Sequence, residues 1–194
     1  MYEYNEFDKT FLLSRAAQFR DQIGPWQDGK LSKDEFHPLR LQNGWFVQRP
    51  APMLRVAVPY GELSRAQLRG LARVAREYDE PEADVSRAAL EAQSKLATAH
   101  LPAHHAHFMT HTNVQFIWIP PSKTADVMDL LATVSMHGIQ TSGNCIRNIT
   151  CDERAGAASD EIANPRPFAK PSRFACGTLI FAPQGLLPRP FHRI

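Results

Sequence analysis

The sequence predicts an α+β fold, with helices packed on one small mixed sheet. Two features support this prediction. Apolar runs typical of strands occur at residues 45–48, 54–58 and 114–119, and stretches with helical apolar spacing lie between and around them. Strands and helices therefore alternate through the middle of the chain, which favours helices covering a sheet. With 194 residues, 43% of them hydrophobic, the chain can bury one substantial core.

The first third of the chain predicts two helical segments. Between residues 8 and 22, apolar side chains recur at helical spacing, and Gly24-Pro25 is expected to end that helix. Ser32 and Glu35 have the spacing of a capping box, so a short helical turn should begin there.

Two strands and a longer helix are predicted next. Residues 45–48 and 54–58 favour two short strands separated by a kink, because prolines between them cannot donate ladder hydrogen bonds. Ser64 and Gln67 form a second capping-box pattern, and the apolar residues that follow recur on one face. This pattern predicts an amphipathic helix that extends to about Tyr78.

The second half of the chain predicts an insertion, a strand and a helix. Residues 80–106 are rich in Glu, Ala and Ser, and we interpret them as an insertion. Residues 114–119 favour a buried strand that Pro120-Pro121 ends, and a helix should run from Thr124 to near Gly138. The proline-rich stretch after residue 165 is expected to be mostly irregular.

Composition narrows the classes of function. A formal net charge of +2 gives no broad electrostatic attraction to nucleic acid or an anionic membrane. No apolar run approaches the roughly 20 residues that span a bilayer, and the first residues are polar. The three cysteines are too few for a disulfide scaffold, so free thiols in a cytoplasmic protein are expected.

The stretch from Thr141 to Asn148 is the most suggestive of chemistry. Its small residues allow a ligand to approach the backbone, while Asn and Arg side chains supply donors for an anion. The alternative, which composition alone favours, is a helix C-cap followed by a turn.

Three motifs carry a resemblance to a known family. They are His37-Pro38-Leu39-Arg40 within residues 36–44, Met53-Leu54-Arg55 within residues 51–61, and Asn144-Cys145-Ile146-Arg147-Asn148 within residues 136–148. In this order they closely resemble the N-terminal half of bacterial sulfite and nitrite reductase hemoproteins. The resemblance covers about residues 1–79 and 107–170.

This resemblance implies a fold and a reaction. The family has a ferredoxin-like half-domain, duplicated in the complete enzyme, that helps to enclose siroheme coupled to a 4Fe-4S cluster. It reduces sulfite to sulfide or nitrite to ammonia with six electrons from a ferredoxin or a flavoprotein. By this resemblance, residues 1–79 and 107–140 form an N-terminal extension and half-domain, and residues 141–194 begin the siroheme and iron-sulfur domain, truncated here.

The resemblance also suggests residues that contact the substrate. Arg147 stands where the family places a substrate-binding arginine, and His111 replaces a second one. An imidazole lacks the permanent charge and fixed fork of a guanidinium, so His111 should bind an anion less strongly. Pro190 and His192 stand in place of two family lysines, which leaves Arg147 alone of four expected cations.

Further residues are candidates for contacting siroheme. Arg40 and Arg55 are expected to meet its carboxylates, although an arginine beside a strand also commonly serves a surface ion pair. The loop residues assigned to the cofactor by the resemblance are Thr141, Ser142, Gly143, Asn144 and Asn148.

No metal site is expected in this chain alone. A 4Fe-4S cluster takes four thiolates, and the chain has only Cys145, Cys151 and Cys176. A partner chain would have to complete it. Four histidines between residues 100 and 107 are candidate ligands for zinc or nickel, but a solvated loop is the favoured interpretation.

The leading hypothesis is an N-terminal portion or degenerate copy of a siroheme-dependent reductase, with little activity alone. A second hypothesis is a non-catalytic binding or assembly module that pairs with a partner carrying the missing half. A third is a decayed fragment without a selected function. An exposed apolar face on the sheet would favour the assembly module, because such a face needs a partner.

Overall fold

The computed structural model describes seven segments of the chain. They are residues 5–48, 51–80, 104–110, 112–139, 141, 152 and 154–164. Several predicted site residues lie outside these segments, namely His111, Ser142, Gly143, Asn144, Arg147 and Asn148. Most of the predicted insertion at 80–106 and the stretch after residue 164 lie outside them as well.

Four strands form one sheet in the described residues. They are β1 (Trp45–Gln48), β2 (Ala51–Ala57), β3 (His107–Met109) and β4 (Asn113–Phe116), in the order β1-β2-β4-β3. The predicted α+β class is confirmed, with one difference in detail. All three strand pairings are antiparallel rather than mixed.

Four α-helices accompany the sheet in the part of the chain that the structure describes. They are α1 (Glu6–Gln27), α2 (Lys33–Gln42), α3 (Arg65–Tyr78) and α5 (Pro121–Thr133), and a 3-10 turn η1 (Pro59–Gly61) precedes α3. The two predicted capping boxes are present at the starts of α2 and α3. A third, formed by Asn5 and Asp8, begins α1. None of the helices in the described segments is both long and apolar enough to cross a membrane.

Helix lengths differ from the prediction in three places. Helix α1 continues through Pro25 to Gln27, because Trp26 stacks on Phe36 with 4.8 Å between ring centroids and meets Trp45 edge-on at 5.7 Å. These aromatic contacts outweigh the local preference for a break. The expected short turn is the ten-residue α2. Helix α5 ends at Thr133, before Ser135 adopts a φ of 57°.

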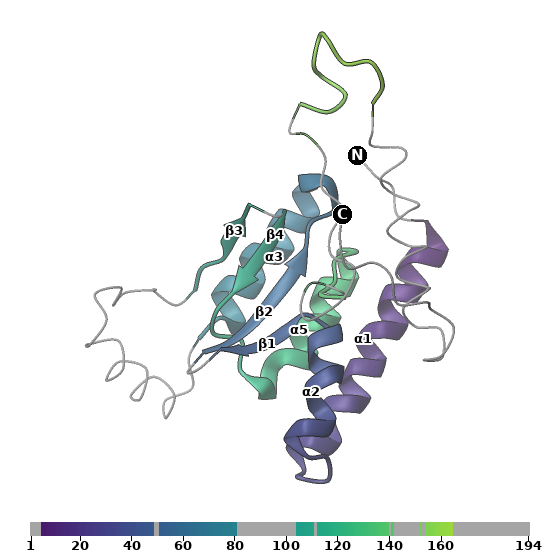
Figure 1. Cartoon of the computed structure of the whole chain (residues 1–194). Helices are drawn as coiled ribbons and strands as arrows, with labels where there is room; N and C mark the ends of the chain where they lie inside the picture. The colour runs from purple at the N-terminus through teal and green to yellow at the C-terminus, as the bar shows by residue number, and fades with distance from the viewer. Residues whose placement is uncertain are drawn as a thin grey trace, which may run out of the picture.

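One face of the sheet, which we call the helix-covered face, forms the core. Leu54 and Val56 of β2 and Val114 and Phe116 of β4 are 0% exposed. They pack with apolar side chains of all four helices in one cluster. Figure 1 shows α3 and α5 behind the sheet, and α1 packs along α5.

The opposite side of the sheet, which we call the second face, is formed by the alternate strand positions. Because successive side chains of a strand point to opposite sides, these residues project away from Leu54, Val56, Val114 and Phe116. The second face comprises Phe46 of β1, Met53, Arg55 and Ala57 of β2, Asn113 and Gln115 of β4, and His107 and Met109 of β3. Its polar members include Arg55, which the family resemblance suggests as a contact of siroheme carboxylates.

Candidate functional site

The candidate site is built on a junction where three chain segments meet. Thr141 follows α5 and is buried, with 2% of its surface exposed. Its hydroxyl oxygen lies 2.7 Å from the carbonyl oxygen of Arg55 and 2.6 Å from that of Gly138. The hydroxyl has one proton and can donate to one of these carbonyls at a time. The contact ties the segment after α5 to strand β2.

Two glycines make this close approach possible. Gly44 has a φ of +80°, and a Cβ there would lie 2.3 Å from the Thr141 hydroxyl and 2.5 Å from the Arg55 carbonyl oxygen. A Cβ on Gly138 would lie 2.3 Å from the Asn43 carbonyl oxygen. Any larger residue would have to push backbone aside at both positions.

The junction also orients the side chain of Arg55. One terminal guanidinium nitrogen donates to the carbonyl oxygen of Thr141 at 3.0 Å, and the other donates to Oε1 of Gln115 at 3.5 Å. The Gln115 amide nitrogen lies 2.8 Å from the sulfur of Met53. The Arg55 side chain is therefore held across the second face by contacts from two other segments.

A polar row crosses three strands of the second face. Arg55 pairs with Gln115, and Gln115 pairs with His107, in the strand register. Neighbouring residues of a cross-strand row lie on the same side of a sheet. No acidic residue occupies a second-face position in the described parts of these strands. Arg55 and Gln115 of this row therefore offer one permanent positive charge and an amide group, which suits a carboxylate or another anion.

Arg40, the other predicted cofactor arginine, has different partners. It lies in the last turn of α2, and its guanidinium carbon is 5.7 Å from the centroid of the Trp45 ring. A terminal nitrogen donates to the Trp45 carbonyl oxygen at 3.4 Å, and burial lowers the pKa of Arg40. Arg40 and Arg55 share no hydrogen-bond partner among the described residues. The structure thus brings together Arg55 and Thr141 but not Arg40.

Two residues of the site escaped the sequence analysis. Gln115 and Gly44 were not singled out, although both lie in apolar or turn patterns that predicted secondary structure. Gln115 lies within the run that predicted a buried strand, and only the strand register puts it beside Arg55. The importance of Gly44 could not be predicted without knowing which segments pack against the turn after α2.

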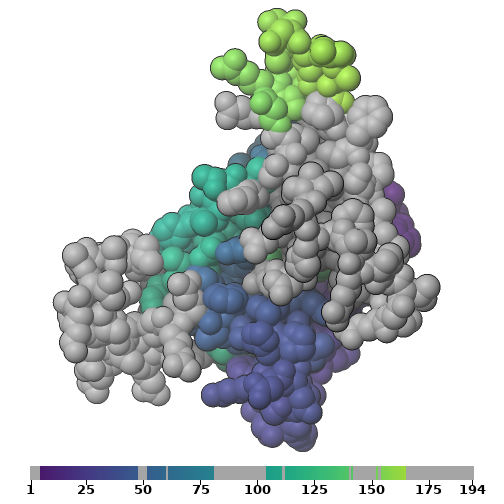
Figure 2. Space-filling view, in the orientation of Figure 1, coloured from purple at the N-terminus to yellow at the C-terminus, as the bar shows by residue number. Residues whose placement is uncertain are grey.

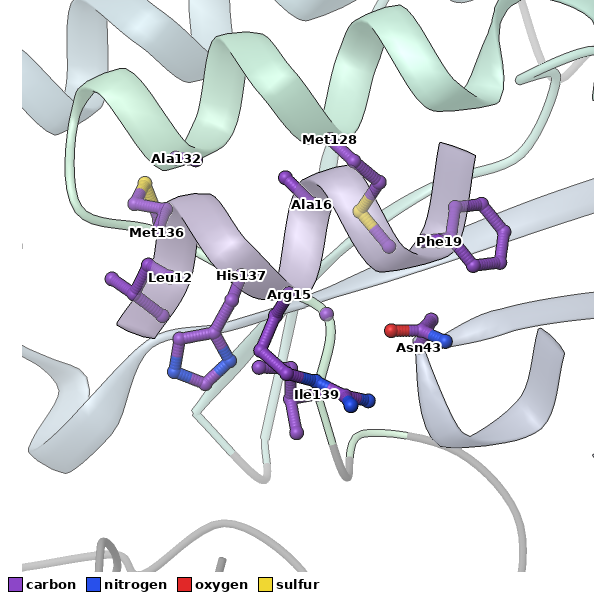
Figure 3. A pocket seen from close by; sticks show the side chains of 11 residues that line it. Leu12, Arg15, Ala16, Phe19, Asn43, Met128, Ala132, Met136, His137 and Ile139 are labelled. Atoms are coloured by element: carbon purple, nitrogen blue, oxygen red, sulfur yellow. The ribbon is translucent and has the colours of Figure 1, made fainter. Parts of the chain in front are cut away.

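A small hollow lies on the other side of this junction, between α1 and the segment after α5. Leu12, Ala16, Met128 and Met136 line it together with Arg15 and His137, as Figure 3 shows. It has room for about one water molecule. The hollow is therefore too small for an organic cofactor.

Metal ligands are sparse in the described segments. No group of three or more His, Cys, Asp or Glu side chains there could hold a metal ion. Cys145, Cys151 and Cys176 all lie outside those segments.

Comparisons with known proteins agree with the fold. Residues 47–88 match the model of the nitrite/sulfite reductase ferredoxin-like half domain. The solved structure of the Mycobacterium tuberculosis NirA protein matches with a TM-score of 0.55 and 20% sequence identity. That match covers 71% of this chain and 24% of the NirA chain. No curated protein matches the sequence.

The matched segment includes strand β2 with Arg55 and helix α3, both of which the structure describes. The order β2-α3-β3-β4-α5 follows the β-α-β-β-α sequence of a ferredoxin-like unit, and β1 fills the sheet position beside β2. The fold is that of a ferredoxin-like half domain, and residues 47–88 are similar in sequence to this half domain of nitrite and sulfite reductases.

Proposed function

We propose that this chain is the N-terminal portion, or a degenerate copy, of a siroheme- and 4Fe-4S-dependent reductase. The reaction would be the six-electron reduction of sulfite to sulfide or of nitrite to ammonia. The observation that carries the proposal is the half-domain match, which includes Arg55. Arg55 is the arginine that the structure fixes on the second face of the sheet.

The second face fits a carboxylate-rich tetrapyrrole. Siroheme carries many carboxylates, which need cations and hydrogen-bond donors around them. Arg55 and Gln115 offer such groups, with no acidic neighbour among the described strand positions of that face. When bound, siroheme would supply the iron that takes up and reduces the anion. Arg55 would hold a carboxylate, and Thr141 would hold Arg55 in place.

The 4Fe-4S cluster does not fit this chain alone. The cluster takes four thiolates, and the whole sequence has three cysteines. A partner chain would have to contribute to the electron-transfer centre. We therefore expect little or no reductase activity from this chain by itself.

The remaining assignments from the resemblance belong to the same proposal. Arg147 would bind the substrate anion, and His111 would offer a weaker contact in place of an arginine. Ser142, Gly143, Asn144 and Asn148 would contribute backbone or side-chain donors to the cofactor. A ferredoxin or a flavoprotein would donate electrons in the cytoplasm.

The first test is cofactor occupancy. The chain would be purified from a host supplied with siroheme, and its absorption spectrum and iron content would be measured on one sample. We expect a Soret band with the charge-transfer features of siroheme and about one iron per siroheme. A colourless, iron-free protein would overturn the cofactor proposal.

A variant pair tests the role of Arg55 in that occupancy. Arg55→Met removes the charge on the second face, and we expect siroheme occupancy to fall about tenfold, because a charge-assisted hydrogen bond contributes roughly 1.5–3 kcal/mol. Arg69→Met, an exposed arginine of α3, is the matched control and should keep wild-type occupancy. Equal occupancy in both variants would remove Arg55 from the site.

A second candidate function, an assembly module, is favoured by the two edge strands. Phe46 and Val47 of β1 are 38% and 41% exposed, and Phe108 and Met109 of β3 are 66% and 40% exposed. Figure 2 shows atoms of β3 and β4 at the surface. Apolar side chains on sheet edges favour pairing with another chain.

Sedimentation velocity over a range of concentrations tests this candidate. If a second copy can stand in for the partner, the wild-type chain should associate, and Phe108→Lys should shift it to monomer. An unchanged association constant in Phe108→Lys would exclude the β3 edge as the pairing surface.

A further inference from the structure

A pair of histidines at the β3 edge has no role in the proposed reductase function. His107 is the first residue of β3, and His105 lies two residues before it in the sequence. Both side chains are half-buried, whereas the neighbouring His104 is exposed. Their rings meet edge to face, with 4.6 Å between centroids. The two imidazoles are thus adjacent and partly withdrawn from solvent.

Two ring nitrogens of this pair are chemically unsatisfied. Nδ1 of His105 and Nε2 of His107 are shielded from solvent and make no hydrogen bond to any residue that the structure describes. A buried imidazole nitrogen normally finds a hydrogen-bond partner or a metal ion, because leaving it bare is costly. These atoms therefore call for a ligand.

The backbone beneath the pair is fixed. The carboxylate of Asp79, which is 0% exposed, accepts hydrogen bonds from the backbone N–H of His105 at 3.2 Å and of Trp118 at 2.8 Å. The Asp79 carbonyl oxygen accepts one from the N–H of His104 at 2.8 Å. Asp79 thus anchors the histidine segment to the end of α3 and places a negative charge close to it. Both features favour a cation held by the two rings.

We propose that His105 and His107 form a two-histidine site for a divalent transition-metal ion of the borderline class, such as Ni²⁺ or Zn²⁺. With metal–nitrogen bonds of about 2.0–2.1 Å, two imidazole nitrogens on one tetrahedral metal ion lie roughly 3.3 Å apart. The two rings are adjacent, with 4.6 Å between centroids, and the proposal requires side-chain rotation to bring the two nitrogens to that separation. No third His, Cys, Asp or Glu ligand is available in the described residues, so water fills the other positions.

Calorimetric titration of the full chain, purified without siroheme, with NiCl₂ tests the proposal. We expect one saturable equivalent in the wild type. His105→Phe and His107→Phe retain an aromatic ring but no ligand nitrogen, and each should weaken binding about 100-fold or more, since loss of an outer-shell partner alone costs about 10- to 100-fold. His37→Phe, an exposed histidine of α2, is the matched control and should bind as the wild type does.

A second readout needs no variant. Diamagnetic Zn²⁺ should shift the imidazole resonances of His105 and His107 in a nuclear magnetic resonance titration and leave those of His37 unchanged. Absence of saturable binding, or binding that survives in both Phe variants with the two imidazoles unshifted, overturns the proposal. Neither result depends on siroheme occupancy, so this site and the proposed reductase function stand or fall separately.

Discussion

The two faces of the same sheet differ in what they contain. On the helix-covered face, Leu54 and Val56 are 0% exposed and belong to one core cluster with apolar side chains of α1, α2, α3 and α5. On the second face, Arg55 lies between them in sequence and binds Thr141 and Gln115. Strand alternation thus puts stability and a candidate site one residue apart. Substitutions at neighbouring positions should therefore have different consequences.

The largest expected difference in stability between the two faces is in β1, between Trp45 and Phe46. Trp45 is 1% exposed and contacts the rings of Trp26 and Phe36, whereas the next residue, Phe46, is 38% exposed. Trp45→Ala should lower the free energy of unfolding by about 3–5 kcal/mol, because it removes a large buried side chain and leaves a cavity. Urea denaturation followed by circular dichroism measures this. Phe46→Ala should cost clearly less, and equal losses would contradict the assignment of the two faces.

A smaller loss of stability is expected at Gly44, in the junction where the turn after α2 packs against Arg55 and Thr141. Gly44→Ala should destabilise the protein by about 3 kcal/mol, through a positive φ and close contacts with the Arg55 and Thr141 segments. Gly29→Ala is the matched control, since Gly29 has a φ of +72° with nothing within 4 Å of the added Cβ. It should cost only the conformational part, about 1 kcal/mol. Thermal or urea denaturation of the pair separates the two contributions, and identical losses would mean that the junction is not tight.

Thr141→Val isolates the hydrogen bonds of the junction. The substitution preserves shape but removes the hydroxyl near the carbonyl oxygens of Arg55 and Gly138, so we expect a loss of about 2 kcal/mol. The control is Thr133→Val, whose exposed hydroxyl bonds only to the Leu130 carbonyl oxygen. Chemical denaturation should find the control near wild type. A near-neutral Thr141→Val would show that the hydroxyl does not fix the junction.

The smallest effect concerns acid stability far from both faces. The hydroxyl and backbone N–H of Ser32 donate to the Glu35 carboxylate, and these bonds hold the pKa of Glu35 below its ordinary value of 4.5. Since the folded-state pKa is the lower one, this stabilisation is present above pH 4.5 and is lost as the pH falls through the folded value. Glu35→Gln should therefore show a smaller decrease in melting temperature between pH 7 and pH 3 than the wild type. A decrease of the same size in both proteins would rule out this contribution.

Much of the fold follows from local sequence signals. Ser32 with Glu35 and Ser64 with Gln67 predicted two helix starts, because a capping box depends only on residues three apart. The passage of α1 through Pro25 was not predictable from such signals, because it depends on the contacts of Trp26 with α2 and β1. Strand β3 was missed because three residues are too short for a recognisable alternation.

The candidate site was predictable only in part. Arg55 was proposed from a motif resemblance, and the structure gives it a defined place on the sheet. Its partners come from residues 60 and 86 positions away, and no local pattern encodes such contacts. The histidine pair illustrates the same limit, since its composition favoured a solvated loop and only the tertiary contacts with Asp79 fix it.

The central claim is that the second face, and not the helix-covered side, meets the cofactor. Backbone amide resonances of the ¹⁵N-labelled chain, recorded with and without siroheme, test this most directly. The claim predicts the largest shifts or broadening at Arg55, Gln115 and Thr141, with little change at Arg20 and Asp126, which form an ion pair between α1 and α5. Perturbations centred on Arg20 and Asp126, or none at saturating siroheme, would contradict it.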